Sequence, residues 1–343
     1  MFDSLPTATT EGASLPLPCI SRSKMPLVPA VPEVSTGNLP SAEIERALGY
    51  AENEKAEATR KAYRADAEIW GAWCRDRGLS PLPASPEALG AFLAAEADAG
   101  RSASTITRRL AAIGYAHKLA GLESPTSHEA VRAVLRGIRR TIGTTPDQKA
   151  PAEAALVRRM IEACPDNLIG LRDQAILAIG FAGALRRSEI AALGCSDIRE
   201  IDGGIELIIR HSKGDQESAG QTIAIPFGTK IQPVAALRAW LAAAGISEGP
   251  LFRSIRKGGA VQAEALSTNA IAEIIKEAAE RAGLPPDQFS GHSLRAGFLT
   301  SAAKSGASIF KMMEVSRHRR IETLQGYVRD AERLRDHAGG SFL

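Results

Sequence analysis

The sequence predicts a mainly α-helical protein of two domains, the second of which also contains a small antiparallel sheet. Three observations support this. From Ser41 onward the chain is rich in alanine and shows helical periodicity with clear starts and stops. The segment GTTPDQKAPA at 143–152 interrupts this pattern with Gly, Pro and polar residues. Two apolar runs within 204–226 flank a polar turn, which is typical of a β-hairpin.

The first 40 residues differ from the rest of the chain. They contain seven prolines together with many Ser and Thr and have no hydrophobic period. Such a segment cannot bury enough apolar surface to offset its ordering entropy, so residues 1–40 are predicted to be a disordered tail.

Residues 41–143 are predicted to form a small helical domain. Ser85 followed by Pro86 is a typical helix start, Gly100 a typical end, and Thr126-x-x-Glu129 resembles a capping box. The expected helices are 41–53, a helix capped by Thr59 and ending near Gly78, 86–100, 102–120, and one from the capping box to Gly143.

Residues 144–152 are the expected linker, and 153–343 the expected second domain. Its predicted helices are 153–163, 168–182, 231–244, 268–282, one beginning around His292, 307–314, 320–328 and 330–337. The hairpin at 204–226 completes it.

Composition and charge narrow the function classes. At 44% hydrophobic and 24% charged residues, the sequence matches a globular protein, and no apolar run is long enough to span a bilayer. The N-terminus does not have the pattern of a secretory signal. Four scattered cysteines and six histidines show no metal-ligand spacing, so we expect reduced thiols, a cytoplasmic location, no metal site and no cofactor.

The net charge is only +3, but basic residues are concentrated late in the first domain. Between Arg101 and Gly143 there are eight Lys and Arg against two Glu, an excess of six positive charges. This is the electrostatic footprint expected for DNA phosphate contacts, although a solvated helix face is the alternative.

The second domain carries an ordered set of basic residues followed by a tyrosine. The segments are ALRRSEI with Arg186, the hairpin turn with Lys213, HSLR with His292 and Arg295, and SRHRRIETLQGYVR with His318 and Tyr327. Together they resemble the tyrosine recombinase (phage integrase) family, most closely its Cre-type simple recombinases. The Leu-Arg-x-Ser-Glu segment places the first Arg of the family pattern at Arg186, and the spacing of nine from His318 to Tyr327 also fits.

The resemblance implies a reaction that matches the chemistry of these side chains. Guanidinium groups donate paired hydrogen bonds to phosphate and stay charged, so Arg186 and Arg295 would clamp a scissile phosphate. His292 and His318 would add hydrogen bonds, with His292 suited to accept the proton of Tyr327. Lys213 would protonate the departing 5′ oxygen. Tyr327 would then hold the DNA through a 3′-phosphotyrosine bond, without metal or ATP.

Each residue also has a structural alternative. Arg186 could be a surface helix arginine, but it is flanked by apolar segments, where an unpaired charge would be costly. Lys213 in a polar turn could simply be solvated, His292 could make a local bond at a helix start, and Tyr327 could be an ordinary half-buried aromatic.

The sequence departs from the family pattern in three places. Ser316-Arg317-His318 stands where Leu-Gly-His is usual, so Arg317 would add a phosphate contact or distort the turn. Gly326 precedes Tyr327 where a bulky residue is common, and the SKGDQESAG turn allows other alignments of Lys213.

The same resemblance implies how DNA would be held. The first domain would be a SAM-like core-binding bundle, and the two domains would form a C-shaped clamp around the duplex. A helix over 102–120 is the expected major-groove element. The candidates for DNA contact are Ser102, Ser104, Thr105, Thr107, Arg108, Arg139, Arg140 and Arg317.

The expected partner is double-stranded DNA with an inverted-repeat target site, bound by a dimer per site and a homotetramer on two sites. A C-terminal helix would dock on a neighbouring protomer. Recombination would proceed through a Holliday junction. The alternatives are DNA relaxation of the type IB topoisomerase kind, or a non-catalytic sequence-specific DNA-binding regulator.

Overall fold

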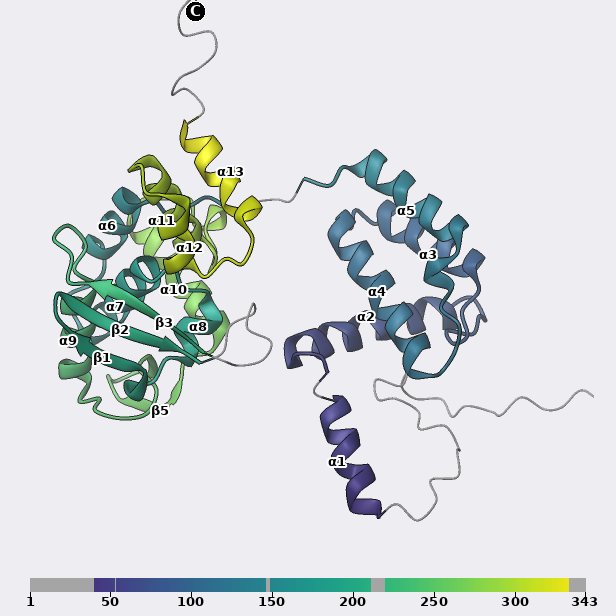
Figure 1. Ribbon diagram of the computed structural model, residues 1–343, viewed down its shortest axis with the longest axis horizontal. Coiled ribbons are helices and arrows are strands. Elements are labelled where there is room, and N and C mark those ends of the chain that lie inside the picture. Colours follow the sequence, from purple (N-terminus) through teal and green to yellow (C-terminus); the bar gives the residue numbers. More distant parts are fainter. Residues whose placement is uncertain (1–39, 53, 146–148, 211–219, 333–343) are drawn as a thin grey trace, which may run out of the picture. The chain divides into compact units, whose positions relative to one another are not determined.

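The structure of the protein is a computed structural model that describes residues 40–52, 54–145, 149–210 and 220–332. The chain divides into two compact units, Met1–Pro146 and Asp147–Leu343 (Figure 1). Three expected features lie outside the described residues: residues 1–39 of the tail, Lys213, and the part of the docking segment beyond residue 332. Within the described part, no helix combines the length and the apolar character needed to cross a membrane.

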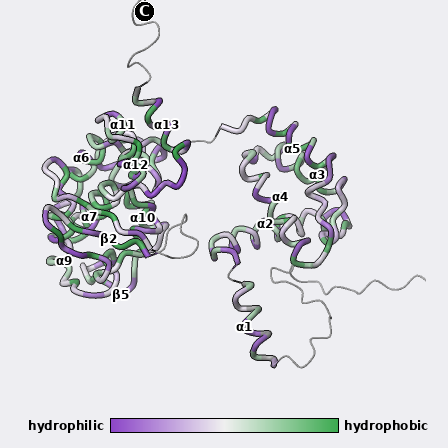
Figure 2. The backbone as a smooth tube through the Cα atoms, viewed as in Figure 1, coloured by the Kyte–Doolittle hydropathy of each residue, from purple (hydrophilic) through white to green (hydrophobic). Residues whose placement is uncertain are grey.

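The first unit is helical. Its elements are α1 (Ser41–Glu52), α2 (Glu57–Arg75), α3 (Pro86–Asp98), α4 (Ala103–Leu119), the 3-10 turn η1 (Pro125–Ser127) and α5 (Glu129–Ile142). Its core centres on Trp70, which is fully buried, contacts Phe92 edge-on and donates a hydrogen bond from Nε1 to the carbonyl of Pro81. Hydrophilic and hydrophobic residues alternate along α5, whose buried face packs against this core (Figure 2).

The helix starts of this unit follow the sequence only in part. Ser85 caps α3 by accepting from the backbone N–H of Ala88, as predicted. The predicted cap at Thr59 is wrong, because α2 already begins at Glu57. The capping box at Thr126 is also wrong, because that residue lies in η1, and His128 caps α5 instead.

The second unit is mostly helical with small antiparallel sheets, so the predicted fold class is confirmed. Its helices are α6 (Ala154–Glu162), α7 (Leu168–Ala182), α8 (Arg187–Ala192), α9 (Pro233–Ala244), α10 (Thr268–Arg281), α11 (Ser293–Lys304), α12 (Ile309–Ser316) and α13 (Ile321–Glu332), with 3-10 turns η2 (Cys195–Asp197) and η3 (Pro286–Gln288). The helix α13 is continuous, where two separate pieces were predicted.

The predicted hairpin is present and gains a third strand. Strands β2 (Gly204–Ile209) and β3 (Gln221–Pro226) pair antiparallel, and β1 (Ile198–Ile201) pairs with the other edge of β2. A separate pair, β4 (Arg253–Ile255) and β5 (Val261–Ala265), was not predicted because β4 has only three residues and two of the three apolar positions of β5 are alanine, which is uncommon in strands. The hairpin turn that would carry Lys213 lies outside the described residues.

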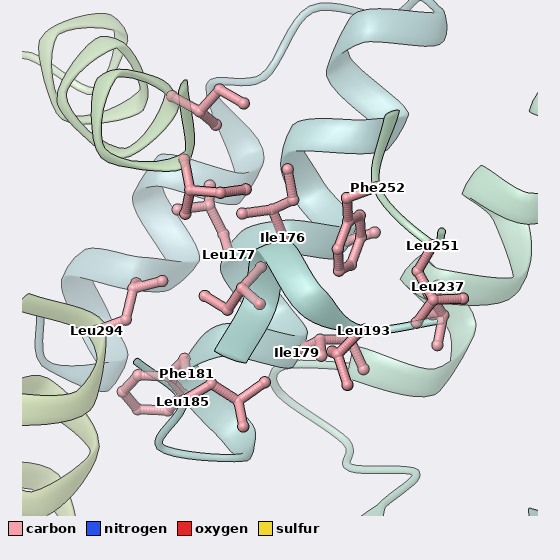
Figure 3. Close-up of a cluster of buried hydrophobic side chains, with 14 of the residues drawn as sticks. Ile176, Leu177, Ile179, Phe181, Leu185, Leu193, Leu237, Leu251, Phe252 and Leu294 are labelled. Atoms are coloured by element: carbon pink, nitrogen blue, oxygen red, sulfur yellow. The ribbon is translucent and has the colours of Figure 1, made fainter. Parts of the chain in front are cut away.

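Helix α7 forms the centre of this unit and is buried on nearly all sides. Figure 3 shows its side chains Ile176, Leu177 and Ile179 packed among residues of the surrounding elements, with Leu294 of α11 nearby. A Cβ on Gly180 would lie 2.8 Å from Cδ1 of Ile190 and 2.9 Å from Cδ1 of Leu294, so a larger residue would force these side chains of α8 and α11 to shift. These two elements position the candidate site.

Candidate active site

Arg186 lies directly before α8, at the N-cap position. Its backbone N–H donates to Oε2 of Glu189 at 2.8 Å, and its Nη1 donates to Oε1 of the same carboxylate at 2.7 Å. The helix start and the side-chain direction of Arg186 are therefore fixed by one buried acid. Glu189 belongs to the segment ALRRSEI, whose pattern alone does not predict this role.

Glu189 is an anion surrounded by two arginines. Burial alone would raise the pKa of its carboxyl group, but Arg317 and Arg186 outweigh burial and hold that pKa below the ordinary value. Glu189 is only 2% exposed, and the desolvation cost of such a carboxylate is offset only when it is paired in this way.

Arg295 on α11 connects three segments of the site and is fully buried. Its Nη1 donates to the carbonyl of Ala184, at 2.7 Å, in the loop before Arg186. Its Nη2 donates to the carbonyl of Ser316 and lies 3.3 Å from both ring nitrogens of His318. Burial, followed by the charges of Arg186 and Arg317, lowers the pKa of Arg295 to about 9, so it remains a cation at neutral pH.

The turn after α12 carries Arg317 in the left-handed backbone region, at φ +59°. Its Nη2 donates to Oε2 of Glu189 at 2.7 Å, and its Nη1 donates to the carbonyls of Gly183 and Val315. The guanidinium is thus buried and bonded. This side chain forms an internal ion pair, with 3% of it exposed, and the phosphate contact expected of Arg317 stays a prediction.

His318 follows this turn and faces Arg295. Its Nδ1 lies 2.8 Å from the hydroxyl of Ser316. Burial, followed by the charge of Arg295 and then by those of Arg186, His292 and Arg317, lowers the pKa of His318 to about 4. The ring is therefore neutral at physiological pH in this structure.

His292 occupies the exposed residue directly before α11. Its backbone N–H donates to Oγ of Ser290 at 3.2 Å. Its charge contributes to the lowered pKa of His318, which places it on the same side of the site.

Tyr327 lies on α13, and its ring is half-buried. It packs against a small cluster formed by Leu299, Met312 and Leu324. Burial raises the pKa of Tyr327, while Arg295 acts in the opposite direction. The phenol is protonated at neutral pH, so its use as a nucleophile requires a base.

The structure thus brings Arg186, Arg295 and His318 together. Tyr327 lies near enough that the charge of Arg295 acts to lower its pKa. Sequence reasoning missed Glu189, Ser316 and the structural role of Arg317. The described residues contain no group of three or more His, Cys, Asp or Glu side chains that could hold a metal ion.

The candidate DNA-contacting residues of the first unit lie on α4 and α5. Ser102 caps α4 by accepting from the N–H of Thr105. Thr107 accepts a hydrogen bond from Nη2 of Arg139 at 3.1 Å, which links the two helices. Ser104 and Arg140 are exposed.

Arg108 differs from these because a buried acid holds it. Its Nε and Nη2 donate to the two carboxylate oxygens of Asp66, at 2.8 and 3.0 Å. Asp66 is 1% exposed, whereas about half of the Arg108 side chain, 49%, faces solvent.

Known proteins match both units. Residues 153–333 match the phage integrase family, and residues 48–123 match the family "Phage integrase, N-terminal SAM-like domain". The integrase/recombinase xerD homolog of Selenomonas ruminantium is 36% identical over 293 residues, which cover 84% of this chain and 86% of that protein. Recombinase cre of Escherichia phage P1 is 29% identical over 299 residues, which cover 81% and 85% of the two chains.

A solved structure shares the fold. The lambda integrase tetramer bound to a Holliday junction matches with a TM-score of 0.57 and 17% identity, over 85% of this chain and 76% of that one.

Proposed function

The chain belongs to the phage integrase family and is a site-specific tyrosine recombinase that acts on DNA, in which we propose that Tyr327 is the nucleophile. The proposed phosphate-binding residues are Arg186, Arg295, His292 and His318. The observation that carries this proposal is the position of Arg295. Its guanidinium contacts the loop before Arg186 and the turn before His318, and its charge acts on Tyr327. Arg186 and Tyr327, which are 141 residues apart in the sequence, thereby lie around one cation.

In the proposed cleavage step the phenolic oxygen of Tyr327 attacks the scissile phosphorus. The bond between phosphorus and the 5′ oxygen breaks, and a 3′-phosphotyrosine bond forms. His292 takes the proton of Tyr327, and Lys213 donates a proton to the departing 5′ oxygen. The reverse reaction rejoins the strand, because the covalent bond conserves the energy of the phosphodiester.

The cations act on the charge that develops during this step. The non-bridging oxygens gain negative charge in the transition state, and preorganised donors stabilise that charge without reorganisation. Glu189 and the carbonyl of Ala184 hold Arg186 and Arg295 in place before DNA arrives. Removing one such donor is expected to lower the cleavage rate on the order of a hundredfold or more.

The relatives support a proposal for the partner and the assembly. We propose that the protein binds an inverted-repeat DNA site as a dimer and joins two sites as a tetramer, the state in which lambda integrase was solved on a Holliday junction. A cytoplasmic location accords with this substrate. The residues Ser102, Ser104, Thr105, Thr107, Arg108, Arg139 and Arg140 are the proposed DNA contacts of the first unit.

The substitution Tyr327→Phe tests the proposed function. A binding site is first selected from random duplexes with this variant, which should bind as the wild type does. Wild-type protein should form a covalent adduct with that site, and the variant none. An adduct that persists in Tyr327→Phe would reject the nucleophile. Relaxation of supercoiled DNA that lacks the selected site would favour a topoisomerase.

A further inference from the structure

The hydroxyl of Ser316 lies between a backbone carbonyl and a ring nitrogen of the site. Its Oγ is 2.6 Å from the carbonyl oxygen of Met312 and 2.8 Å from Nδ1 of His318. Ser316 is fully buried, and its bond to Met312 is buried as well, whereas its bond to His318 is partly buried. The chain has Ser here where the related family pattern has Leu, which offers no acceptor.

The direction of the two hydrogen bonds follows from the chemistry of the atoms. A carbonyl oxygen only accepts, so the hydroxyl hydrogen of Ser316 must point to Met312. The oxygen of Ser316 is then left as an acceptor towards His318. Its partner must be a protonated Nδ1, which leaves a lone pair on Nε2 of the neutral ring.

The contact with Arg295 does not distinguish the two tautomers, because its Nη2 lies 3.3 Å from both ring nitrogens of His318. The assignment therefore rests on the two bonds of Ser316. In the opposite tautomer a bare Nδ1 would face an oxygen whose hydrogen is already engaged with Met312.

We propose that Ser316 is a positioning residue for strand cleavage: it holds His318 in the Nδ1–H tautomer, so that the hydrogen bond which His318 donates to the DNA phosphate uses a proton gained at Nε2. This inference rests on the proposed function. A neutral ring with a bare Nε2 cannot donate to a phosphate oxygen. The ring must first become an imidazolium, and Ser316 accepts from Nδ1–H in both forms, so the ring does not have to turn.

The charged groups around the ring make this proton uptake depend on DNA. Arg295 faces it from α11, Arg186 from the start of α8, His292 from the start of α11, and Arg317 from the same turn, and all of them disfavour the imidazolium. An anionic phosphate placed among these cations opposes their effect. Protonation of His318 is thus coupled to engagement of the scissile phosphate.

A purely structural reading of Ser316 is the alternative. Serine near a helix end often donates to the carbonyl four residues earlier, as Ser316 does to Met312. That bond alone would make Ser316 a helix-end residue with no influence on His318. The two readings differ in what happens to the imidazole when the hydroxyl is removed.

The first test reads the tautomer directly. In full-length protein labelled with nitrogen-15 histidine, the His318 signals are assigned by their loss in His318→Asn. Above neutral pH we expect a protonated Nδ1 and a bare Nε2 in the wild type, and a shift towards protonated Nε2 in Ser316→Ala. A ring that keeps the Nδ1–H form in Ser316→Ala would overturn the proposal.

The second test measures cleavage of the selected DNA site. We expect Ser316→Ala to form the covalent adduct about tenfold to a hundredfold more slowly, with DNA binding retained, as is usual when a group that orients a functional histidine is removed. Ser316→Thr, which keeps the hydroxyl, should recover most of the rate. A Ser316→Ala variant that cleaves as fast as the wild type would overturn the proposal.

The matched control is Ser308→Ala at the other end of α12. Ser308 caps this helix by accepting from the N–H of Lys311, and its contact is remote from His318. It should lose helix stability but keep the rate and the tautomer. An equal loss of rate in Ser308→Ala would show that Ser316 acts only through α12. If the wild type itself forms no adduct, the proposed function fails, while the tautomer measurement still decides the role of Ser316.

Discussion

Arg317 and Glu189 form a buried ion pair across 128 residues of sequence, with Nη2 of the arginine 2.7 Å from Oε2 of the acid. The arginine adopts a left-handed backbone conformation, which favours glycine, to make this contact. The same acid holds Arg186 through its other oxygen. The turn before His318 and the helix start at Arg186 are therefore tied to one carboxylate.

The first prediction concerns the stability of this pair. Arg317→Ala should lower the free energy of unfolding by about 3–5 kcal/mol, because it removes one partner of a buried charge. Arg317→Gly should cost about 1 kcal/mol less, since glycine relieves the left-handed backbone. Urea unfolding measures both values. A glycine variant less stable than the alanine variant would contradict the role of the backbone.

The second prediction concerns Glu189 as a positioning residue. Glu189→Gln keeps the size of the side chain but weakens its hold on Arg186 and Arg317, so adduct formation should slow about tenfold to a hundredfold. Binding of the selected DNA site should change little, because phosphate contacts elsewhere are intact. Glu206→Gln, on the surface of β2, is the control and should cleave normally. Equal rates for Glu189→Gln and the wild type would contradict this role.

The third prediction concerns pH. The pKa of His318 in the folded protein is lowered to about 4 from its ordinary value of 6.5. The unfolded chain therefore binds more protons between these values, and stability rises with pH from about 4 to 6.5 and is fully present above that window. His318→Asn should flatten this rise in urea unfolding experiments.

Glu189 also contributes to the pH dependence of stability, at lower pH. The pKa of Glu189 is lowered from 4.5, so its contribution is lost only as the pH falls below that value. Burial also lowers the pKa of His117 from 6.5, so both histidines contribute between about pH 4.5 and 6.5, and the difference in slope between the wild type and His318→Asn gives the part that belongs to His318. An unchanged slope in His318→Asn would show that the ring is not neutral in the folded protein.

The site was predictable from the sequence where its residues stand in local segments. Arg186, Arg295, His318 and Tyr327 could be named because each lies in a segment with its own pattern. The ion pair of Arg317 could not be predicted, because its partner Glu189 lies 128 residues away in the sequence and only the fold brings them together. Its place in the basic segment RHRR suggested DNA, whereas the left-handed turn directs the side chain inward.

The same distinction applies to the fold. The helix start at Ser85 was predictable because its cap bond spans three residues. The capping box predicted at Thr126 was wrong for an equally local reason. Pro125 begins a 3-10 turn that includes Thr126, so this residue cannot cap the helix that follows. The strand pair β4 and β5 was missed because β4 is only three residues long and the alternating segment Val261–Ala265 has alanine at two of its three apolar positions.

The last prediction concerns Arg108 and its support by Asp66. With Nε and Nη2 bound to the carboxylate, the remaining hydrogens on Nη1 and Nη2 form a free edge on a half-exposed side chain. An arginine edge of this kind matches the O6 and N7 acceptors of guanine. We therefore expect Arg108 to read one guanine, with Asp66 fixing its direction.

This expectation separates base contacts from phosphate contacts. In site selection with Tyr327→Phe as the background, Arg108→Ala should remove the preference at one base pair, at a cost of about 1–3 kcal/mol for the preferred base. Asp66→Asn should weaken the same preference, because its amide no longer accepts both bonds. Arg140→Ala, exposed on α5, should weaken all sequences alike and reduce the salt dependence by about one phosphate contact. A uniform loss in Arg108→Ala would mean that this arginine contacts the backbone, and that Asp66 orients a phosphate ligand instead.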